Sequence, residues 1–257
     1  MQRQYDIGTS VLTSTLRLWS GTWGKLAATA PVKLLELFDR EDDPQCRLVR
    51  EVLTELNIDA LIYPCPLGGQ RFLRRRTQLH PHGKSAVPLL FDPNTEKVLQ
   101  GPEEIITYLF AQYAGHSTPP ARLRDSAFNR VSSSLASMAR GPIHAEASIA
   151  PKKKLTLYSF ESSPFSRLVR ERLCALELHY QLINVGKLNW GEMGPATRRL
   201  APGPYQPEHG SKREEFLHKF GKVQLPFLID PNHKTQLFES RDIIHYLDQH
   251  YAKSVQR

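Results

Sequence analysis

The chain has 257 residues, 40% of them hydrophobic, which is enough to bury one large core or two smaller ones. A net charge of +8 favours anionic ligands, but no nucleic-acid-binding motif accompanies it, so we expect no specific nucleic acid partner. Three cysteines without a CxxC pair exclude a disulfide framework and a standard dithiol centre, and indicate a reducing compartment. No apolar run reaches the ~20 residues of a transmembrane helix, and no histidine spacing predicts a metal site.

Residues 1–32 are predicted to be a leader with one short amphipathic helix. Its apolar residues are Val11, Leu12, Leu16, Leu18, Trp19 and Trp23. Because the polar face carries little positive charge beyond Arg17, we expect this helix to pack on its own protein. Attachment to the surface of a membrane is the alternative.

Residues 33–114 follow the order strand, helix, strand, helix, then two strands of a hairpin and a closing helix. The predicted elements are strand 34–38, helix 44–57, strand 60–63, helix 70–79, strand 89–91, a return strand from 98, and helix 102–113. The first two strands are expected to be parallel, since a helix connects them. This βαβ-ββα order is that of a thioredoxin-like domain.

Residues 115–151 are rich in Ser, Pro, Ala and Arg and are predicted to be a linker with one helix near 123–138. Residues 152–253 then repeat the earlier pattern. The predicted elements are strand 155–160, helix 164–178, strand 180–185, a strand opened by Pro226, strand 236–238, and helix 239–251 capped at Ser240. An insertion at 186–222, rich in Gly and Pro and then helical at 212–220, separates the second and third strands.

An internal repeat supports two equivalent units. The segment Arg47-Leu48-Val49-Arg50-Glu51 recurs 120 positions later as Arg167-Leu168-Val169-Arg170-Glu171, and residues 87–94 match residues 225–232 at an offset of 138. A weaker match at an offset of 119 relates Thr13-Ser14-Thr15-Leu16 in the leader to Ser132-Ser133-Ser134-Leu135 in the linker. The sequence therefore predicts an α/β protein with two tandem thioredoxin-like domains.

Both units resemble the N-terminal, thioredoxin-fold domain of glutathione S-transferases, and the second is the closer. Three elements carry the resemblance: Ser163-Pro164-Phe165-Ser166, Leu225-Pro226 and Phe238-Glu239-Ser240. The whole chain resembles bacterial and plastid proteins with two such domains in tandem. The resemblance implies glutathione as a co-substrate or ligand, Ser163 as the catalytic hydrogen-bond donor to its thiolate, and a cis peptide bond before Pro226. It also implies that Leu225 pairs with the backbone of glutathione, and that Glu239 and Ser240 hold its γ-glutamyl end.

The physical chemistry of the residues agrees with this role for Ser163. A serine followed by proline at the start of a helix is a good N-cap, and the unpaired N–H groups there favour an anion such as a thiolate. Purely structural readings stay open: Ser163 and Ser240 as helix caps only, Pro226 as an element of the fold only, and Ser166 as structural. Arg167 and Arg170 are predicted to be helix-surface or ion-pair residues rather than ligand contacts.

The first unit departs from the family pattern. Asp43 stands where the second unit has Ser163, and Gly101-Pro102 stands in place of Glu239-Ser240. A carboxylate would repel a thiolate, so the first unit is expected to be inactive towards glutathione. The possible thiols are Cys46, predicted to be partly buried, and Cys65, predicted to be more exposed; their proximity stays open.

The chain also departs from complete transferases, which continue into an all-helical C-terminal domain that builds the pocket for the electrophile. No such domain is recognised before residue 257, so that pocket is absent or is built from the leader, the 186–222 insertion or the other repeat. The leading hypothesis is a glutathione-binding, transferase-like protein, with catalysis left open. The alternatives are a non-catalytic protein-interaction module and, less strongly, a thiol-disulfide oxidoreductase. The expected partners are a small-molecule thiol and possibly a protein or a second copy, in the cytoplasm or alternatively a plastid.

Overall fold

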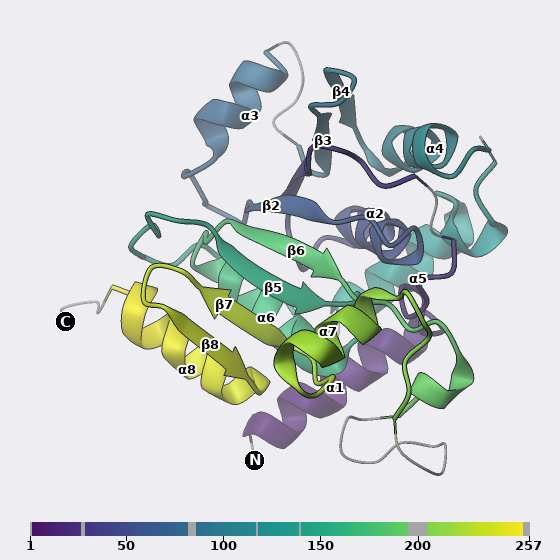
Figure 1. The fold of residues 1–257 in the computed structure, drawn as a ribbon. Coiled ribbons are helices and arrows are strands. Elements are labelled where there is room, and N and C mark those ends of the chain that lie inside the picture. The colour runs from purple at the N-terminus through teal and green to yellow at the C-terminus, as the bar shows by residue number, and fades with distance from the viewer. Residues whose placement is uncertain are drawn as a thin grey trace.

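The computed structural model describes residues 2–26, 29–81, 86–116, 118–138, 140–194 and 205–253. These residues form one eight-stranded sheet with helices on both faces (Figure 1). The strands are β1 (Leu35–Asp39), β2 (Ala60–Pro64), β3 (Leu89–Asp92), β4 (Lys97–Gln100), β5 (Leu155–Ser159), β6 (Tyr180–Asn184), β7 (Phe227–Asp230) and β8 (Thr235–Phe238). The helices are α1 (Gln2–Leu16), α2 (Pro44–Glu55), α3 (Leu73–Leu79), α4 (Pro102–Tyr113), α5 (Ala127–Met138), α6 (Pro164–Ala175), α7 (Lys212–Phe220) and α8 (Ser240–Tyr251), with short 3-10 helices η1 (Ala121–Leu123) and η2 (Trp190–Glu192).

The two repeats have the same internal topology. In the first, β1 pairs parallel with β2 and antiparallel with β3, which pairs antiparallel with β4. In the second, β5 pairs parallel with β6 and antiparallel with β7, which pairs antiparallel with β8. Each repeat is thus a βαβ-ββα thioredoxin-like unit, and the predicted fold class is confirmed.

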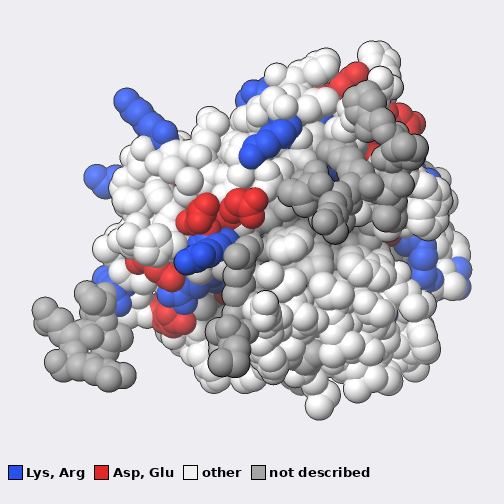
Figure 2. Space-filling model, turned by 90° about the horizontal axis from the view of Figure 1, so that it is seen from below, with Lys and Arg blue, Asp and Glu red and all other residues white. Residues whose placement is uncertain are grey.

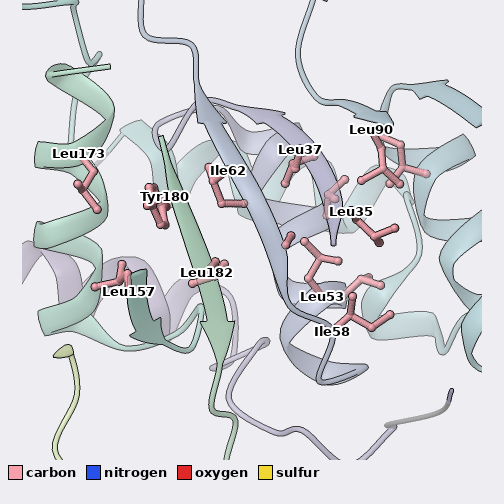
Figure 3. Packing of buried hydrophobic residues seen from close by; sticks show 14 of the residues in the cluster. Leu35, Leu37, Leu53, Ile58, Ile62, Leu90, Leu157, Leu173, Tyr180 and Leu182 are labelled. Carbon is pink, nitrogen blue, oxygen red and sulfur yellow. The ribbon is translucent and has the colours of Figure 1, made fainter. Parts of the chain in front are cut away.

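The two units share a single sheet because β2 pairs antiparallel with β6, in the strand order β4-β3-β1-β2-β6-β5-β7-β8. Ile62 lies opposite Tyr180 at this junction, and Ala60 lies opposite Leu182. Figure 3 shows Ile62, Tyr180 and Leu182 side by side between the cores of the two repeats. The buried apolar residues of both repeats form one continuous cluster, so the junction is part of the core.

The two faces of the sheet carry different helices. On β5, Leu155 and Leu157 point into the main core with α6 and α8, whereas Tyr158 points to the opposite face. There Tyr158 packs with Phe216 and Phe220 of α7 and with Phe227 of β7. The 212–220 part of the insertion is therefore a helical cover for the second repeat; residues 195–204 of the insertion lie outside the described residues.

A buried ionic cluster joins α2 to α6 across the two repeats. Arg170 contacts Glu41 at 2.9 Å and Glu161 at 3.0 Å, and Arg50 contacts Glu161 at 3.0 Å and Asp39 at 2.6 Å. Burial opposes ionisation of Glu161, but the surrounding arginines outweigh it and lower its pKa to about 2. Sequence analysis expected ion-pair or surface positions for Arg167 and Arg170; both are fully buried, so the surface alternative is wrong.

Helices α1 and α5 pack beside each other below α6 and α2, with their polar sides inward. Ser14 Oγ donates to Ser162 O at 2.8 Å, and Ser133 Oγ donates to Pro44 O at 2.8 Å. Arg17, on the residues that follow α1, reaches Asn129 on α5. The leader helix therefore packs on its own protein, as expected, but through small hydroxyl side chains, while its apolar side faces outward. None of the helices in the described residues is both long and apolar enough to cross a membrane.

Two local expectations differ from the structure. The linker helix begins at Ala127, because residues 121–123 form a separate 3-10 turn. Ser240 is the first residue of α8 rather than its N-cap; Glu239 holds the cap position without a capping side-chain hydrogen bond. Reading Ser240 as a structural cap is therefore wrong.

Candidate functional site

A cavity of about 540 Å³ lies where α6 and α8 begin, next to the third strand of the second repeat. The five residues that sequence analysis singled out in this repeat all line it, although 77 positions separate the first from the last. Its lining residues are Val11, Trp19, Thr22, Phe160, Ser163, Pro164, Phe165, Lys187, Glu192, Met193, Gly194, Arg213, Val223, Gln224, Leu225, Pro226, Glu239 and Ser240.

Ser163 is the N-cap of α6 and is buried. Its Oγ accepts a hydrogen bond from Ser166 N at 3.3 Å, so the hydroxyl oxygen serves the cap while its hydrogen remains available. In the described part of the chain no acceptor is found for that hydrogen. Ser163 is thus a structural cap whose hydroxyl can also donate, and it stands at the start of a helix, where an anion is favoured.

Glu239 adopts a backbone conformation that residues other than glycine rarely adopt, with φ 69° and ψ 120°. The equivalent residue of the first repeat, Gly101, has φ 85° and ψ 157°, which costs glycine little. A non-glycine residue held in this region costs about 1–3 kcal/mol and is found mostly at functional sites. The exposed Glu239 carboxylate accepts a hydrogen bond from Gln224 at the rim of the cavity.

Ser240 follows as the first residue of α8, with its side chain buried in the cavity wall. The first N–H groups of a helix have no partners within it, so the start of α8 presents donors to a carboxylate. Leu225 and Pro226 form the adjacent wall, and their peptide bond is cis, as is the bond between Val87 and Pro88 in the first repeat.

The leader and the insertion build the opposite side of the cavity. Val11, Trp19 and Thr22 come from the leader, and Lys187, Glu192 and Met193 come from the insertion. The sequence alone leaves three possible sources for a co-substrate pocket: the leader, the insertion and the other repeat. The described lining takes residues from the first two of these segments.

A short β-bridge holds these two segments together. Lys187 N donates to Thr22 O at 2.8 Å, and Gly24 N donates to Lys187 O at 3.0 Å. The backbones approach so closely that a Cβ on Gly186 would lie 2.7 Å from Gly24 N. Glycine at position 186 is thus required for the leader to close this wall.

The leader also fixes the turn that carries Ser163. Ser162 N donates to Gly21 O at 3.2 Å, and the Ser162 hydroxyl bonds to Thr22. A Cβ on Gly21, which has φ +76°, would lie 2.7 Å from the side chain of Glu161. The residues immediately before Ser163 are therefore held by leader contacts on one side and by the ionic cluster on the other.

The equivalent position in the first repeat has a different chemistry. Asp43 caps α2 by accepting from Gln45 N and Cys46 N, and it also pairs with Arg40 at 3.1 Å. Its carboxylate is thus engaged in capping and pairing and offers no hydroxyl donor. A second cavity lies beside the first repeat, but along Leu99 and the start of α4 rather than at Asp43.

The cysteines are not placed as reactive thiolates. Cys46 is completely buried rather than partly buried, and burial followed by the charge of Asp43 raises its thiol pKa. Cys65 is half-buried, and burial raises its pKa to about 12. Cys174 is buried, which raises its pKa as well. A thiolate is disfavoured at all three positions.

Several lining residues had no signal in the sequence analysis. Trp19 and Thr22 lie far from Ser163 along the chain, and the internal repeat gave them no functional counterpart. Arg213 is buried in the wall, where its guanidinium donates to the carbonyls of Val185 and Gly186. The insertion has no counterpart of equal length in the first repeat, and this extra length was the only sign in the sequence that residues of the insertion line the site.

Comparison with known protein families gives two matches to one family model. The model is described as glutathione S-transferase, N-terminal domain, and it matches residues 37–117 and 157–254. Neither the curated proteins nor the solved structures include a match to the chain.

Proposed function

Because the chain belongs to the glutathione S-transferase N-terminal domain family, we propose that its second repeat binds glutathione in the cavity at the start of α6. The observation that carries this proposal is the convergence of Ser163, Leu225–Pro226 and Glu239–Ser240 on one cavity. Its volume of about 540 Å³ lies within the ~300–1,000 Å³ usual for small-ligand sites.

Each end of glutathione has a chemically suitable partner in this arrangement. The Ser163 hydroxyl would donate to the sulfur, which stabilises the thiolate over the thiol and raises the amount of nucleophile at neutral pH. The N–H groups at the start of α8 would bind the γ-glutamyl carboxylate, and Glu239 would accept from the ammonium group. The backbone of Leu225 would pair with that of the peptide ligand.

The opposite wall offers room for a second reactant. Val11, Trp19 and Met193 of this wall are apolar, whereas Thr22, Lys187 and Glu192 are polar, so this side suits an electrophile that has both an apolar body and a polar group. If the protein is an enzyme, the thiolate sulfur attacks a carbon of this electrophile and forms a bond to it. In a substitution the bond from that carbon to the leaving group breaks and the group departs with the electron pair; in an addition to an activated double bond the π bond breaks and the resulting carbanion takes a proton from water. The proposal of glutathione binding does not depend on this step.

Two other functions are less well supported. A thiol-disulfide exchange reaction needs an accessible thiolate, whereas burial raises the pKa of both Cys46 and Cys65. A non-catalytic interaction module would hold a protein partner in the same grooves or in the cleft between the repeats, and it has no need for the donor at Ser163.

Thermal unfolding with and without glutathione tests the proposal. A ligand at a hundred times its Kd stabilises the fold by about 2.7 kcal/mol, which raises Tm by roughly 5–10 °C for a chain of this size. Ser163→Ala is expected to weaken glutathione binding about tenfold or more, because a hydrogen bond to a charged group is lost. The same variant should bind S-methylglutathione as the wild type does, since that ligand has no ionisable thiol.

The matched control is Asp43→Ser, which places serine at the equivalent cap of the first repeat. It should leave the affinity for glutathione unchanged. Absence of any shift at millimolar glutathione would overturn the proposal and favour the interaction module. A shift without turnover of model electrophiles would retain binding and exclude transfer to those electrophiles.

A further inference from the structure

Two consecutive residues of the leader, Leu18 and Trp19, have backbone conformations that bulky side chains rarely adopt. Their φ angles are 50° and 56°, in the left-handed region, where the Cβ atom lies too close to the backbone. Such conformations cost free energy, persist only where surrounding contacts enforce them, and occur mostly at functional sites. The placement of Trp19 therefore needs a reason beyond the connection of α1 to the rest of the chain.

The matching part of the linker shows that the repeated architecture does not require this conformation. At the offset of 119 that relates the leader to the linker, Trp19 corresponds to Met138. Met138 is still part of α5, whereas α1 already ends at Leu16. Met138 is 76% exposed, and Trp19 only 37%. The leader thus turns away from its helix earlier than the linker does, and the turn brings an indole out of the solvent.

Hydrogen bonds hold this turn against the start of α6. Trp19 N donates to Ser14 O at 2.9 Å, and Thr22 Oγ1 donates to Trp19 O. The Thr22 hydroxyl also bonds to Ser162, the residue immediately before Ser163. The backbone of Trp19 is therefore tied to the turn that carries Ser163, and these bonds offset the cost of its conformation.

The side chain of Trp19 lines the same cavity as Ser163, and Val11 and Phe165 add further apolar surface to that lining. The lining residues that the leader contributes carry no charge. Figure 2 views the molecule from the side on which α1 lies and shows a broad area there without Lys, Arg, Asp or Glu. The flat, uncharged indole of Trp19 therefore suits a flat, uncharged group of a ligand in this cavity.

We propose that Trp19 determines specificity by stacking on an aromatic group bonded to the sulfur of glutathione. This inference rests on the proposed glutathione site, in which the sulfur lies at Ser163. An indole gains more from a flat ring than from an alkyl chain of similar size, because offset-stacked and edge-to-face pairs add attraction beyond the area that they bury. The leader, rather than an additional domain, thus recognises the group on the sulfur.

Calorimetric titration of the full chain with S-methyl-, S-hexyl- and S-benzylglutathione tests this inference. The hexyl and benzyl groups are of similar apolar size, so the ratio of their Kd values reports ring stacking rather than apolar burial. The wild type should bind the benzyl ligand more tightly than the hexyl ligand. Trp19→Leu should reduce this preference about 2- to 12-fold and leave the Kd of S-methylglutathione unchanged. Trp19→Phe keeps an aromatic ring and should retain most of the preference.

Trp190→Leu is the matched control, because Trp190 is 73% exposed and lies outside the described lining of the cavity. It should leave the ratio of Kd values unchanged. A wild type without the preference, a preference that persists in Trp19→Leu, or an equal loss in Trp190→Leu would overturn the role of Trp19 and leave the glutathione site intact. A wild type that does not bind S-methylglutathione would instead overturn the proposed function, and this inference with it.

Discussion

Replacement of Glu239 by glycine is expected to affect stability and ligand binding in opposite directions, because it removes both the backbone strain and the negative charge at the rim of the cavity. Glu239 has φ 69°, and its counterpart Gly101 shows that the backbone at this position suits glycine. Relief of strain gains about 1–3 kcal/mol, and the greater freedom of glycine in the unfolded chain offsets ~0.5–1 of it. We expect Glu239→Gly to stabilise the protein by about 1 kcal/mol, a rise in Tm of roughly 2–4 °C.

The same substitution should weaken glutathione binding. Loss of a charge-assisted hydrogen bond to the ammonium group costs about 1.5–3 kcal/mol, which raises Kd roughly 10- to 150-fold. Calorimetric titration with glutathione and thermal unfolding of the same samples measure both effects. Glu239→Gln isolates the charge, because it keeps the strained backbone: affinity should fall without a gain in Tm.

Lys234→Gly is the matched control for strain. Lys234 also has a positive φ, 54°, but lies in the β7–β8 turn outside the cavity lining. It should raise Tm without changing Kd. The reasoning fails if Glu239→Gly lowers Tm, or if it raises Tm and binds glutathione as tightly as the wild type.

Four further substitutions test the residues that hold the site in place. Arg170→Met should cost about 3–5 kcal/mol in a denaturant titration, because it removes close contacts to two buried carboxylates, Glu41 and Glu161, and leaves Arg50 as their main partner. Arg167→Met should cost less, since Arg167 Nε has no partner and the contacts of its Nη2 with Ser14 and Glu161 are 3.4–3.9 Å long; equal losses would contradict this. The pKa of Glu161 is about 2 when folded against an ordinary 4.5, so its contribution is full above pH 4.5 and disappears as the pH falls towards 2. Asp39 has the opposite effect on stability. Burial raises its pKa from 3.8 to about 6, so its contribution to the free energy of unfolding falls as the pH rises from 3.8 to 6. Comparing wild type with Glu161→Gln by acid titration isolates the first effect, and identical acid transitions would refute it. Gly186→Ala should displace the leader, with a loss of about 1–3 kcal/mol and weaker glutathione binding, both measurable by thermal shift; a wild-type Tm would refute the close approach.

The repeat and the order of elements were predictable from local pattern. The matches at Arg47–Glu51 and residues 87–94 define two βαβ-ββα units, and residues 212–220 form a helix with the predicted bounds. These features depend on short-range periodicity and on turn residues, which a single sequence contains.

The joining of the two sheets was not predictable. Nothing in the alternation of β2 or β6 specifies which strand lies beside it, because either edge could have been covered by a helix or left in solvent. The inside-out orientation of α1 and α5 was missed for a related reason. An apolar stripe normally marks the buried side, and only the contacts of Ser14 and Ser133 with the starts of other helices reverse it.

The side of the candidate site that carries the family motifs was predictable from the sequence, whereas the opposite side, built from the leader and the insertion, was not. Ser163 and Glu239 stand in recognisable short patterns, whereas Trp19 and Thr22 enter the cavity through contacts between segments about 140 residues apart. Such contacts depend on tertiary packing rather than on local sequence. Whether Ser163 is more than a structural cap is decided by ligand binding to Ser163→Ala.

The pairing of β2 with β6 has a consequence for how the chain tolerates loss of function in its first half. Cutting the molecule between the repeats would expose the borders of β2 and β6, whose free N–H and C=O groups could pair with other chains, so either half alone is expected to aggregate. A first repeat without a ligand site, as Asp43 predicts, would still be needed as a scaffold, because it covers the border of β6.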